Sequence, residues 1–337
     1  MEKTFLNNSN VFKTFYLSLI SVTVAVSNMV WNHSKNSGWE NSVHLSTTQS
    51  IFLVFFTSLQ IITGTLSNGF VIVTFLAARE LRRRPSDLFI LNLAVADLIF
   101  LTTFQPWLTH VLNQKAVLTF EAEYYVYESL GCFVNLSSQH AIMLIAIDRL
   151  LAVVLPLRYK TLVTRKVIYI SIIISWTFAL LFSLVNYFAY IFKFYLTFLG
   201  FWTSFQLVLM LGIILIYTFI FTTTLKKIRK SLRQRGMFHL QNEHIQYRTV
   251  FKITLNTMIL VCLFYTTFLP IIIYIGHRSL VLELGNKFQM VTRSWIYSFS
   301  SLNSCINPFI YALRTKRFKK ASFRFWCNIT YRTSTIN

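Results

Sequence analysis

Charged residues are scarce in this sequence, where they make up 13% of the 337 residues, about half of the share that is typical of soluble domains. Hydrophobic residues reach 55%, and a soluble fold with so little charge would expose large apolar patches to water. Intrinsic disorder is excluded for the same reason, because disordered chains have low hydrophobicity. The composition therefore indicates a polytopic membrane protein.

Glycine, proline and cysteine are rare as well. With 9 Gly and 5 Pro, the chain is neither collagen-like nor rich in linkers. The 4 cysteines form no CxxC pair and have no metal-ligand spacing, so neither a zinc site nor a disulfide-dense fold is indicated. The hydrolase and metalloprotease motifs GxSxG and HExxH are also absent, which argues against an enzyme.

Seven apolar runs follow residue 50, and each is long enough to cross a bilayer. They cover residues 51–78, 87–112, 122–155, 167–191, 194–224, 250–276 and 289–313. We therefore predict an all-α membrane protein, with a seven-transmembrane helix bundle over residues 51–313. An odd number of runs without internal duplication argues against an inverted-repeat transporter.

The distribution of basic residues predicts the orientation in the membrane. The net charge is +21, from 32 Lys+Arg against 11 Asp+Glu. Most of the basic residues lie in the breaks after the first, third, fifth and seventh runs, and positive charge marks the cytoplasmic face. The N-terminus is therefore expected outside and the C-terminus in the cytoplasm. The basic excess reflects topology and attraction to lipids, not nucleic-acid binding.

Residues 1–50 are predicted to form an extracellular N-terminal segment. Its one apolar stretch, residues 15–26, follows two lysines and ends in small residues. It is either a cleaved signal peptide over residues 1–27 or an apolar stretch too short to span a membrane. The sequons that begin at Asn7 and Asn32 are candidate glycosylation sites outside the cell.

Asp97 lies near the middle of the second apolar run, where an ionised carboxylate is costly. Polar residues at a similar depth in other runs are Ser138, Asn303, Ser304 and Asn307. One interpretation is a hydrogen-bonded knot that holds helices together. The other is a small-cation site within that knot, since these neighbours offer oxygen ligands instead of a basic partner.

Several short motifs occur in order along the seven runs, each at a definite depth. They are Gly64-Thr65-Leu66-Ser67-Asn68, Leu93-Ala94-Val95-Ala96-Asp97, Asp148-Arg149-Leu150, Pro156, Trp176, Tyr217, Phe268-Leu269-Pro270 and Asn307-Pro308-Phe309-Ile310-Tyr311. In this order they resemble the class A (rhodopsin-like) G-protein-coupled receptors. The resemblance extends from Ile51 to Cys327.

The resemblance implies roles for individual residues at the inner side of the membrane. Arg149 resembles the arginine that is released from its neighbouring acid on activation to meet the G protein. Tyr217 and Tyr311 resemble the tyrosines that swing inward, and Pro270 is expected to kink the sixth span. The implied coupling and activation residues are Asp148, Arg149, Tyr217, Phe268, Pro270, Asn307, Pro308 and Tyr311.

The same resemblance implies partners and a location, whereas a bound ion is expected because the buried carboxylate must be neutralised. It implies a multi-pass plasma-membrane receptor that binds a heterotrimeric G protein, with arrestin as a further partner. An allosteric Na⁺ is expected at Asp97, with Ser138 as a direct ligand and Asn303, Ser304 and Asn307 acting through water, and no other cofactor is expected. Residues 314–337 should form a short amphipathic helix on the inner leaflet and a tail, with Cys327 as a palmitoylation site.

Four departures from the family pattern stand out. Tyr124 replaces the usual cysteine at the outer end of the third span, and the second outer loop, a few residues around Ile191–Phe194, contains no partner cysteine. Leu209 replaces a proline in the fifth span and Phe268 a tryptophan in the sixth. No acid lies at the inner end of the sixth span. The short second loop, the missing disulfide and the fifth span without its proline together resemble the melanocortin-like and lipid-receptor branches. Glu128 is a further weak melanocortin-like feature, although melanocortin receptors have Asp-Pro where this chain has Asn-Pro.

Two classes of ligand can be excluded from the sequence. Amine receptors carry an aspartate at the position of Gly131, and opsins bind retinal through a lysine at the position of Ser301, so neither ligand is expected. A peptide, a lipid or another small molecule remains. The candidate ligand-binding residues are Trp107, Glu128, Cys132, Asn135, Phe268 and Tyr274. A seven-span transporter or ligand-gated channel is the alternative function.

Overall fold

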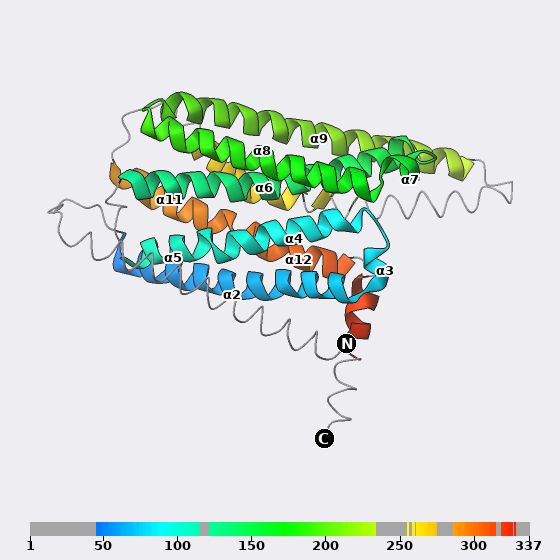
Figure 1. The fold of residues 1–337 in the computed structure, drawn as a ribbon, viewed down its shortest axis with the longest axis horizontal. Coiled ribbons are helices and arrows are strands. Elements are labelled where there is room, and N and C mark those ends of the chain that lie inside the picture. The colour runs from blue at the N-terminus through cyan, green and yellow to red at the C-terminus, as the bar shows by residue number, and fades with distance from the viewer. Residues whose placement is uncertain are drawn as a thin grey trace, which may run out of the picture.

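Helices that run side by side along the long axis build the molecule (Figure 1). The computed structural model describes residues 45–114, 121–233, 255, 258–259, 261–274, 286–314, 318–325 and 327, and within these ranges there is no strand. The helices are α2 (Thr47–Ala77), α3 (Arg79–Arg82), α4 (Asp87–Thr102), α5 (Phe104–Gln114), α6 (Glu121–Val154), α7 (Tyr159–Leu162), α8 (Arg165–Ile191), α9 (Tyr195–Arg233), α11 (Asn286–Ser300) and α12 (Leu302–Arg314). Residues 261–274 and 318–325 are helical too. The predicted all-α bundle is confirmed.

The most apolar helices are long enough to cross a membrane. Among the described residues, five helical stretches meet this description, and the helix Val261–Tyr274 is shorter but apolar. In α6, 61% of the most apolar stretch is buried, against 22% in α8 and in α9. The outward faces of α8 and α9 are therefore apolar, as lipid contact requires, and α6 is the central helix.

Two of the predicted spans are divided by a break, which the hydrophobic pattern did not predict. The run 87–112 was expected to be one helix, but α4 ends at Thr102 and α5 begins at Phe104. Pro106 has no N–H to donate to the carbonyl of Thr102, and the Thr103 hydroxyl donates to the carbonyl of Ile99 at 2.7 Å. These local effects end α4 within the membrane.

The second break, at Ser301, separates α11 from α12, although residues 289–313 were expected to be continuous. Gln60 of α2 contacts both breaks, because its Oε1 accepts from Gln105 Nε2 at 2.8 Å and from Ser301 Oγ at 3.0 Å. Its Nε2 donates to the carbonyl of Ser298 at 3.0 Å. One buried amide thus links α2, α5 and the end of α11.

A proline in α12 opens a further contact between helices. Pro308 cannot donate to the carbonyl of Ser304, and this carbonyl accepts from Asn68 Nδ2 of α2 at 2.7 Å. The Asn68 amide also donates to the carbonyl of Gly64 at 2.9 Å. Asn68 of α2 therefore supplies the hydrogen bond that Pro308 cannot donate within α12.

The two ends of the bundle carry short connections. Between α8 and α9 only Phe192–Phe194 are non-helical, with Lys193 in the left-handed region at φ 60°, so the short second outer loop is confirmed. At the opposite end, the 318–325 helix lies near α3 (Figure 1).

The 318–325 helix is amphipathic, as predicted. Phe318 and Ala321 are buried, while Lys319 and Lys320 are exposed. The ring of Phe318 lies edge-on to Phe70 of α2, with centroids 6.2 Å apart. The helix therefore packs its apolar side on the bundle and leaves basic side chains outside.

Candidate functional site

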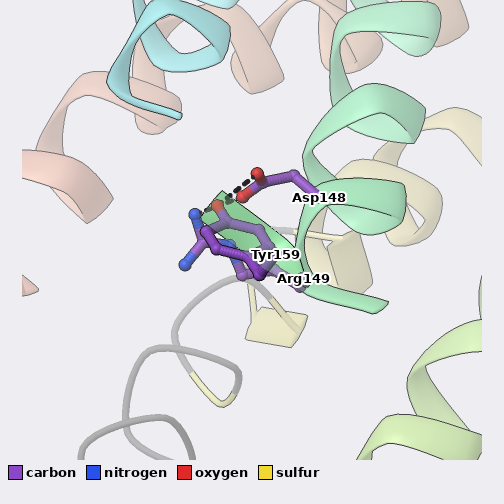
Figure 2. Close-up of polar contacts among 3 residues, drawn as sticks. All are labelled: Asp148, Arg149 and Tyr159. Carbon is purple, nitrogen blue, oxygen red and sulfur yellow. Dashed lines mark hydrogen bonds and ion pairs between the residues drawn. The ribbon is translucent and has the colours of Figure 1, made fainter. Parts of the chain in front are cut away.

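A buried ion pair lies at the end of α6 that faces α7. Arg149 pairs with its neighbour Asp148, and the hydroxyl of Tyr159 donates to Asp148 Oδ1 at 2.6 Å (Figure 2). Asp148 is buried, whereas the Arg149 side chain remains 19% exposed. The carboxylate therefore holds the arginine and the tyrosine at once, and the arginine retains access to solvent.

Tyr159 is a member of this site that the sequence did not predict. It follows Asp148 by eleven residues, and the short helix α7 brings it back against the end of α6. Burial, with the negative charge of Asp148 next, raises the pKa of Tyr159 well above its ordinary value. The phenol therefore keeps its proton at physiological pH and acts as a donor to the carboxylate.

Asp97 of α4 is the centre of a second polar cluster. Its side chain is buried and accepts from Ser304 Oγ at 2.9 Å, from Asn307 Nδ2 at 2.8 Å and from Ser138 Oγ at 3.3 Å. These contacts join α4, α6 and α12. The predicted fourth neighbour, Asn303, instead donates to the carbonyl of Phe264 at 3.3 Å.

The donors around Asp97 are of the type that binds a small hard cation. One carboxylate and the hydroxyl oxygens of Ser138 and Ser304 are ligands of this kind. Asn68, which contacts the Ser304 carbonyl, has a buried Oδ1 with no hydrogen-bond partner among the described residues. The residues present therefore fit an alkali cation as well as a hydrogen-bonded knot.

A small cavity of ≈ 40 Å³ lies at the other end of α6. Four predicted ligand-binding residues line it: Glu128, Cys132, Asn135 and Phe268. The other lining residues are Gly131, Asn186, Tyr190, Phe198, Leu199, Trp202, Ile271 and Tyr297. Trp107 and Tyr274 are not part of this lining, and Trp107 packs on Tyr127 with ring centroids 3.7 Å apart.

Residues of α8 and α9 also line the cavity, although the predicted ligand-binding residues included none from these helices. The tight turn at Lys193 holds these two helices together, so Asn186 and Trp202 face the same space. The sequence feature that could have indicated this lining is the group of aromatic residues on both sides of a very short loop. The pocket is thus centred on spans three, four, five and six, with a contribution from span seven.

Glu128 is the acidic residue of the lining. Its Oε2 accepts from the Tyr297 hydroxyl at 3.4 Å, which links α6 to α11. At Gly131 an added Cβ would lie 2.8 Å from the ring of the buried Phe104. A side chain at this position therefore requires Phe104 to move, which is a physical reason against an acidic group there.

The remaining predicted activation residues are distributed over three helices. Tyr217 is buried in α9, and Phe268 is buried and stacks on Phe264 with centroids 5.3 Å apart. Pro270 lies in the 261–274 helix, and Pro308 and Tyr311 lie in α12. Of these residues, Phe268 lines the cavity and the others are not part of its lining.

The predicted modification sites are only partly within the described structure. Asn7, Asn32 and the signal peptide 1–27 lie outside the described residues. Cys327 is exposed just beyond the 318–325 helix.

The described residues form a bundle that includes five helices long and apolar enough to cross a membrane. Its central helix has a cavity at one end and a buried Asp–Arg pair at the other, which is the architecture of a membrane receptor. The family model described as 7 transmembrane receptor (rhodopsin family) matches residues 67–311. The chain belongs to this family, whose members are receptors rather than enzymes, and it is a multi-pass membrane protein.

Curated relatives extend this similarity. The chain is 27% identical over 299 residues to cannabinoid receptor 1 of Xenopus laevis, covering 78% of this chain and 61% of that receptor. It is 31% identical over 170 residues to a Gq-coupled rhodopsin of Mizuhopecten yessoensis, covering 46% of this chain and 34% of the relative. With melanopsin-A of Danio rerio it shares 30% over 129 residues, 38% of this chain and 22% of the relative. The chain thus spans less than two thirds of the length of these relatives.

Proposed function

We propose that this protein is a G-protein-coupled receptor that transmits an extracellular ligand signal to a heterotrimeric G protein. The observation that carries the proposal is the arrangement on α6, where Glu128, Cys132 and Asn135 line a cavity and Arg149 ends the same helix in a buried ion pair. A ligand and a G protein thus contact opposite ends of one central helix.

The mechanism is a shift between two conformations. In the conformation described here Arg149 is held by Asp148. A ligand that binds better to the conformation with Arg149 released moves the population toward it. By linkage, a bound G protein raises the affinity for that ligand by the same factor.

A transporter or ligand-gated channel is less well supported. Family membership favours the receptor, and the Asp148–Arg149–Tyr159 contacts at one end of α6 fit the proposed G-protein coupling. The ligand is a peptide, a lipid or a small molecule. Retinal is not proposed despite the opsin relatives, because the buried Ser301 hydroxyl donates to Gln60 where opsins carry the retinal lysine.

Nucleotide exchange tests the function directly. The full chain in nanodiscs is mixed with purified G proteins of each class, and GTP uptake is measured against empty nanodiscs. Exchange above the empty control supports the receptor function, and ligand libraries can then be screened with the same readout. Exchange equal to that control with all G-protein classes, with and without the libraries, would contradict it.

We also propose location and regulation for the same function. The receptor lies in the plasma membrane with its N-terminus outside, binds arrestin as well as G protein, and is palmitoylated at Cys327. Asp97 and Ser138 hold a Na⁺ ion, with Asn303, Ser304 and Asn307 completing the network through water. The ion supplies a positive charge that compensates the buried carboxylate, and its proposed effect is to stabilise the resting conformation.

A further inference from the structure

The cavity beside α6 has a carboxylate in its lining and no positive charge. Glu128 carries the carboxylate, and none of the described residues that line the cavity is a lysine, an arginine or a histidine. Lys193, in the turn between α8 and α9, is exposed and is not part of the lining, so water and salt screen its charge. The charge of the lining therefore favours a cation over an anion.

Two asparagines add hydrogen-bond acceptors to this lining. Asn135 Nδ2 donates to the carbonyl of Gly131 at 2.8 Å, and Asn186 Nδ2 donates to Ser129 Oγ at 3.4 Å. Within the described part of the chain, neither Oδ1 accepts a hydrogen bond. Together with the carboxylate of Glu128, the lining has three acceptor groups. A protonated primary amine has three N–H donors and no acceptor, so it matches this set.

Aromatic side chains form much of the remaining wall. They come from four parts of the bundle, namely Tyr190 of α8, Trp202 of α9, Phe268 of the 261–274 helix and Tyr297 of α11. The faces of aromatic rings attract cations, and tryptophan does so most strongly. Because those faces are negative, they give no such stabilisation to a carboxylate or a phosphate. The aromatic wall and the charged group thus select the same sign of charge.

The size of the cavity limits which part of a ligand enters it. Pockets that enclose a whole small molecule measure about 300–1,000 Å³, whereas this cavity measures ≈ 40 Å³. It therefore accommodates a head group, and the remainder of the ligand lies outside. Glu128 precedes Gly131 by three residues, so the charge lies one helical turn from the position that is acidic in amine receptors.

We propose that the ligand enters this cavity with a protonated primary amine, which binds Glu128, Asn135 and Asn186 and lies against Trp202. This inference rests on the proposed receptor function and specifies the ligand of the same cavity. Glu128 supplies the opposite charge, and the two asparagine oxygens accept the remaining N–H groups. A free peptide N-terminus, a lysine side chain and an amino lipid all carry such a head group. Ligands that lead with a carboxylate or a phosphate are rejected.

Cys132 provides a probe inside the cavity. It lines the cavity and follows Glu128 by four residues on α6, a spacing that places both side chains on one face of the helix. Methanethiosulfonate reagents attach to a thiol with release of methanesulfinate, and they are made with different head groups. Cys262→Ala and Cys327→Ser remove the two exposed cysteines, and Cys305 is buried.

Three reagents test the charge and the donors of the head group. The 2-aminoethyl reagent carries a primary ammonium, the 2-sulfonatoethyl reagent is an anion, and the 2-(trimethylammonio)ethyl reagent is a cation without N–H donors. Labelling of Cys132 in the full chain in nanodiscs is followed by mass spectrometry, and each rate is divided by the rate for free 2-mercaptoethanol. Glu128→Gln removes the charge and keeps the size. Glu80→Gln, at an exposed glutamate of α3, is the matched control.

We expect the 2-aminoethyl reagent to label Cys132 at least about tenfold faster than the 2-sulfonatoethyl reagent, because an unlike charge one helical turn away attracts the first and repels the second. Glu128→Gln should reduce this ratio by about tenfold, and Glu80→Gln should leave it unchanged. The 2-aminoethyl reagent should also exceed the trimethylammonio reagent. Asn186→Leu should reduce that second preference and leave the ratio of cation to anion unchanged.

Several results would overturn the inference. Equal normalised rates for cation and anion, or a ratio that persists in Glu128→Gln, would remove the role of the charge. Labelling by the trimethylammonio reagent as fast as by the 2-aminoethyl reagent would exclude a primary amine. No labelling by any reagent would show that the cavity admits no head group.

The failure of the inference and the failure of the proposed function are distinguishable. The comparison of reagents on the chain with Glu128 intact needs no substitution in the lining, so it decides even if Glu128→Gln does not fold. Labelling also needs no G protein. If the chain activates no G protein, the proposed function fails, and the labelling rates still decide which head group the cavity binds.

Discussion

At the scale of single residues, the Asp148 carboxylate holds Arg149 and Tyr159 together. Arg149→Ala should abolish G-protein activation, because the guanidinium is the cationic group at this end of α6 that the proposed coupling requires. Surface expression should persist, since the side chain is partly exposed. The measurement is nucleotide exchange at matched surface levels. Normal signalling by the variant would reduce Arg149 to an anchor at the membrane surface.

Tyr159→Phe isolates one hydrogen bond of the same site. The ring stays and the donor to Asp148 is lost, and a hydrogen bond to a charged group contributes about 1.5–3 kcal/mol. Since 1.4 kcal/mol is about tenfold, basal signalling should rise by roughly one order of magnitude. Tyr169→Phe, at an exposed tyrosine of α8, is the matched control and should leave basal signalling unchanged. Equal basal signalling in both variants would assign no resting-state role to the Tyr159 hydroxyl.

Asp97→Asn tests the proposed ion site. The asparagine keeps hydrogen-bonding capacity toward Ser304 and Ser138, so the fold should survive, but the charge that attracts Na⁺ is lost. In the unmodified chain, NaCl should raise the thermal midpoint relative to N-methylglucamine chloride at equal ionic strength, because the ion binds the resting conformation better. The variant should show no such difference. A sodium effect that persists in Asp97→Asn would place the ion elsewhere.

At the scale of helices, α2 approaches its neighbours most closely at Gly64. A Cβ there would lie 2.6 Å from Leu101 Cδ1 and 2.9 Å from Cys305 Sγ, whereas one at Gly69 would meet nothing within 4 Å. Gly64→Ala should therefore destabilise the bundle by about 1–3 kcal/mol through overpacking. Gly69→Ala should be neutral or slightly stabilising, because alanine favours helix. The thermal midpoints of the two variants test this prediction, and equal midpoints would contradict close packing at Gly64.

At the scale of the whole molecule, two contacts that are usual in the family are missing from this sequence. The outer disulfide of the family is absent, because all 4 cysteines lie elsewhere, and the sequence has no acid at the inner end of the sixth span to bind Arg149. We therefore expect signalling without ligand. Second-messenger levels in expressing cells should exceed those in mock-transfected cells, and equal levels across several G-protein readouts would argue against a loosely held resting state.

Hydrophobic runs and ordered motifs were sufficient to predict the helix bundle, because an apolar run of membrane length has no stable state other than a spanning helix. The pairing of Asp148 with Arg149 followed from adjacency in the chain. The helix breaks at Thr103 and Ser301 could not be predicted, because a hydropathy pattern does not show which carbonyl lacks a donor or which side chain reaches it. The Gln60 contacts that join both breaks link residues more than forty positions apart.

The sequence by itself determined the class of fold, the order of the spans and the placement of Asp97 and Arg149, because these depend on local composition and on the transfer of side chains between water and lipid. Only the tertiary structure decided that Tyr159 returns to Asp148 and that α8 and α9 line the cavity. Those properties depend on which faces of separate helices meet. Packing fixes that choice, and spacing along the chain does not encode it.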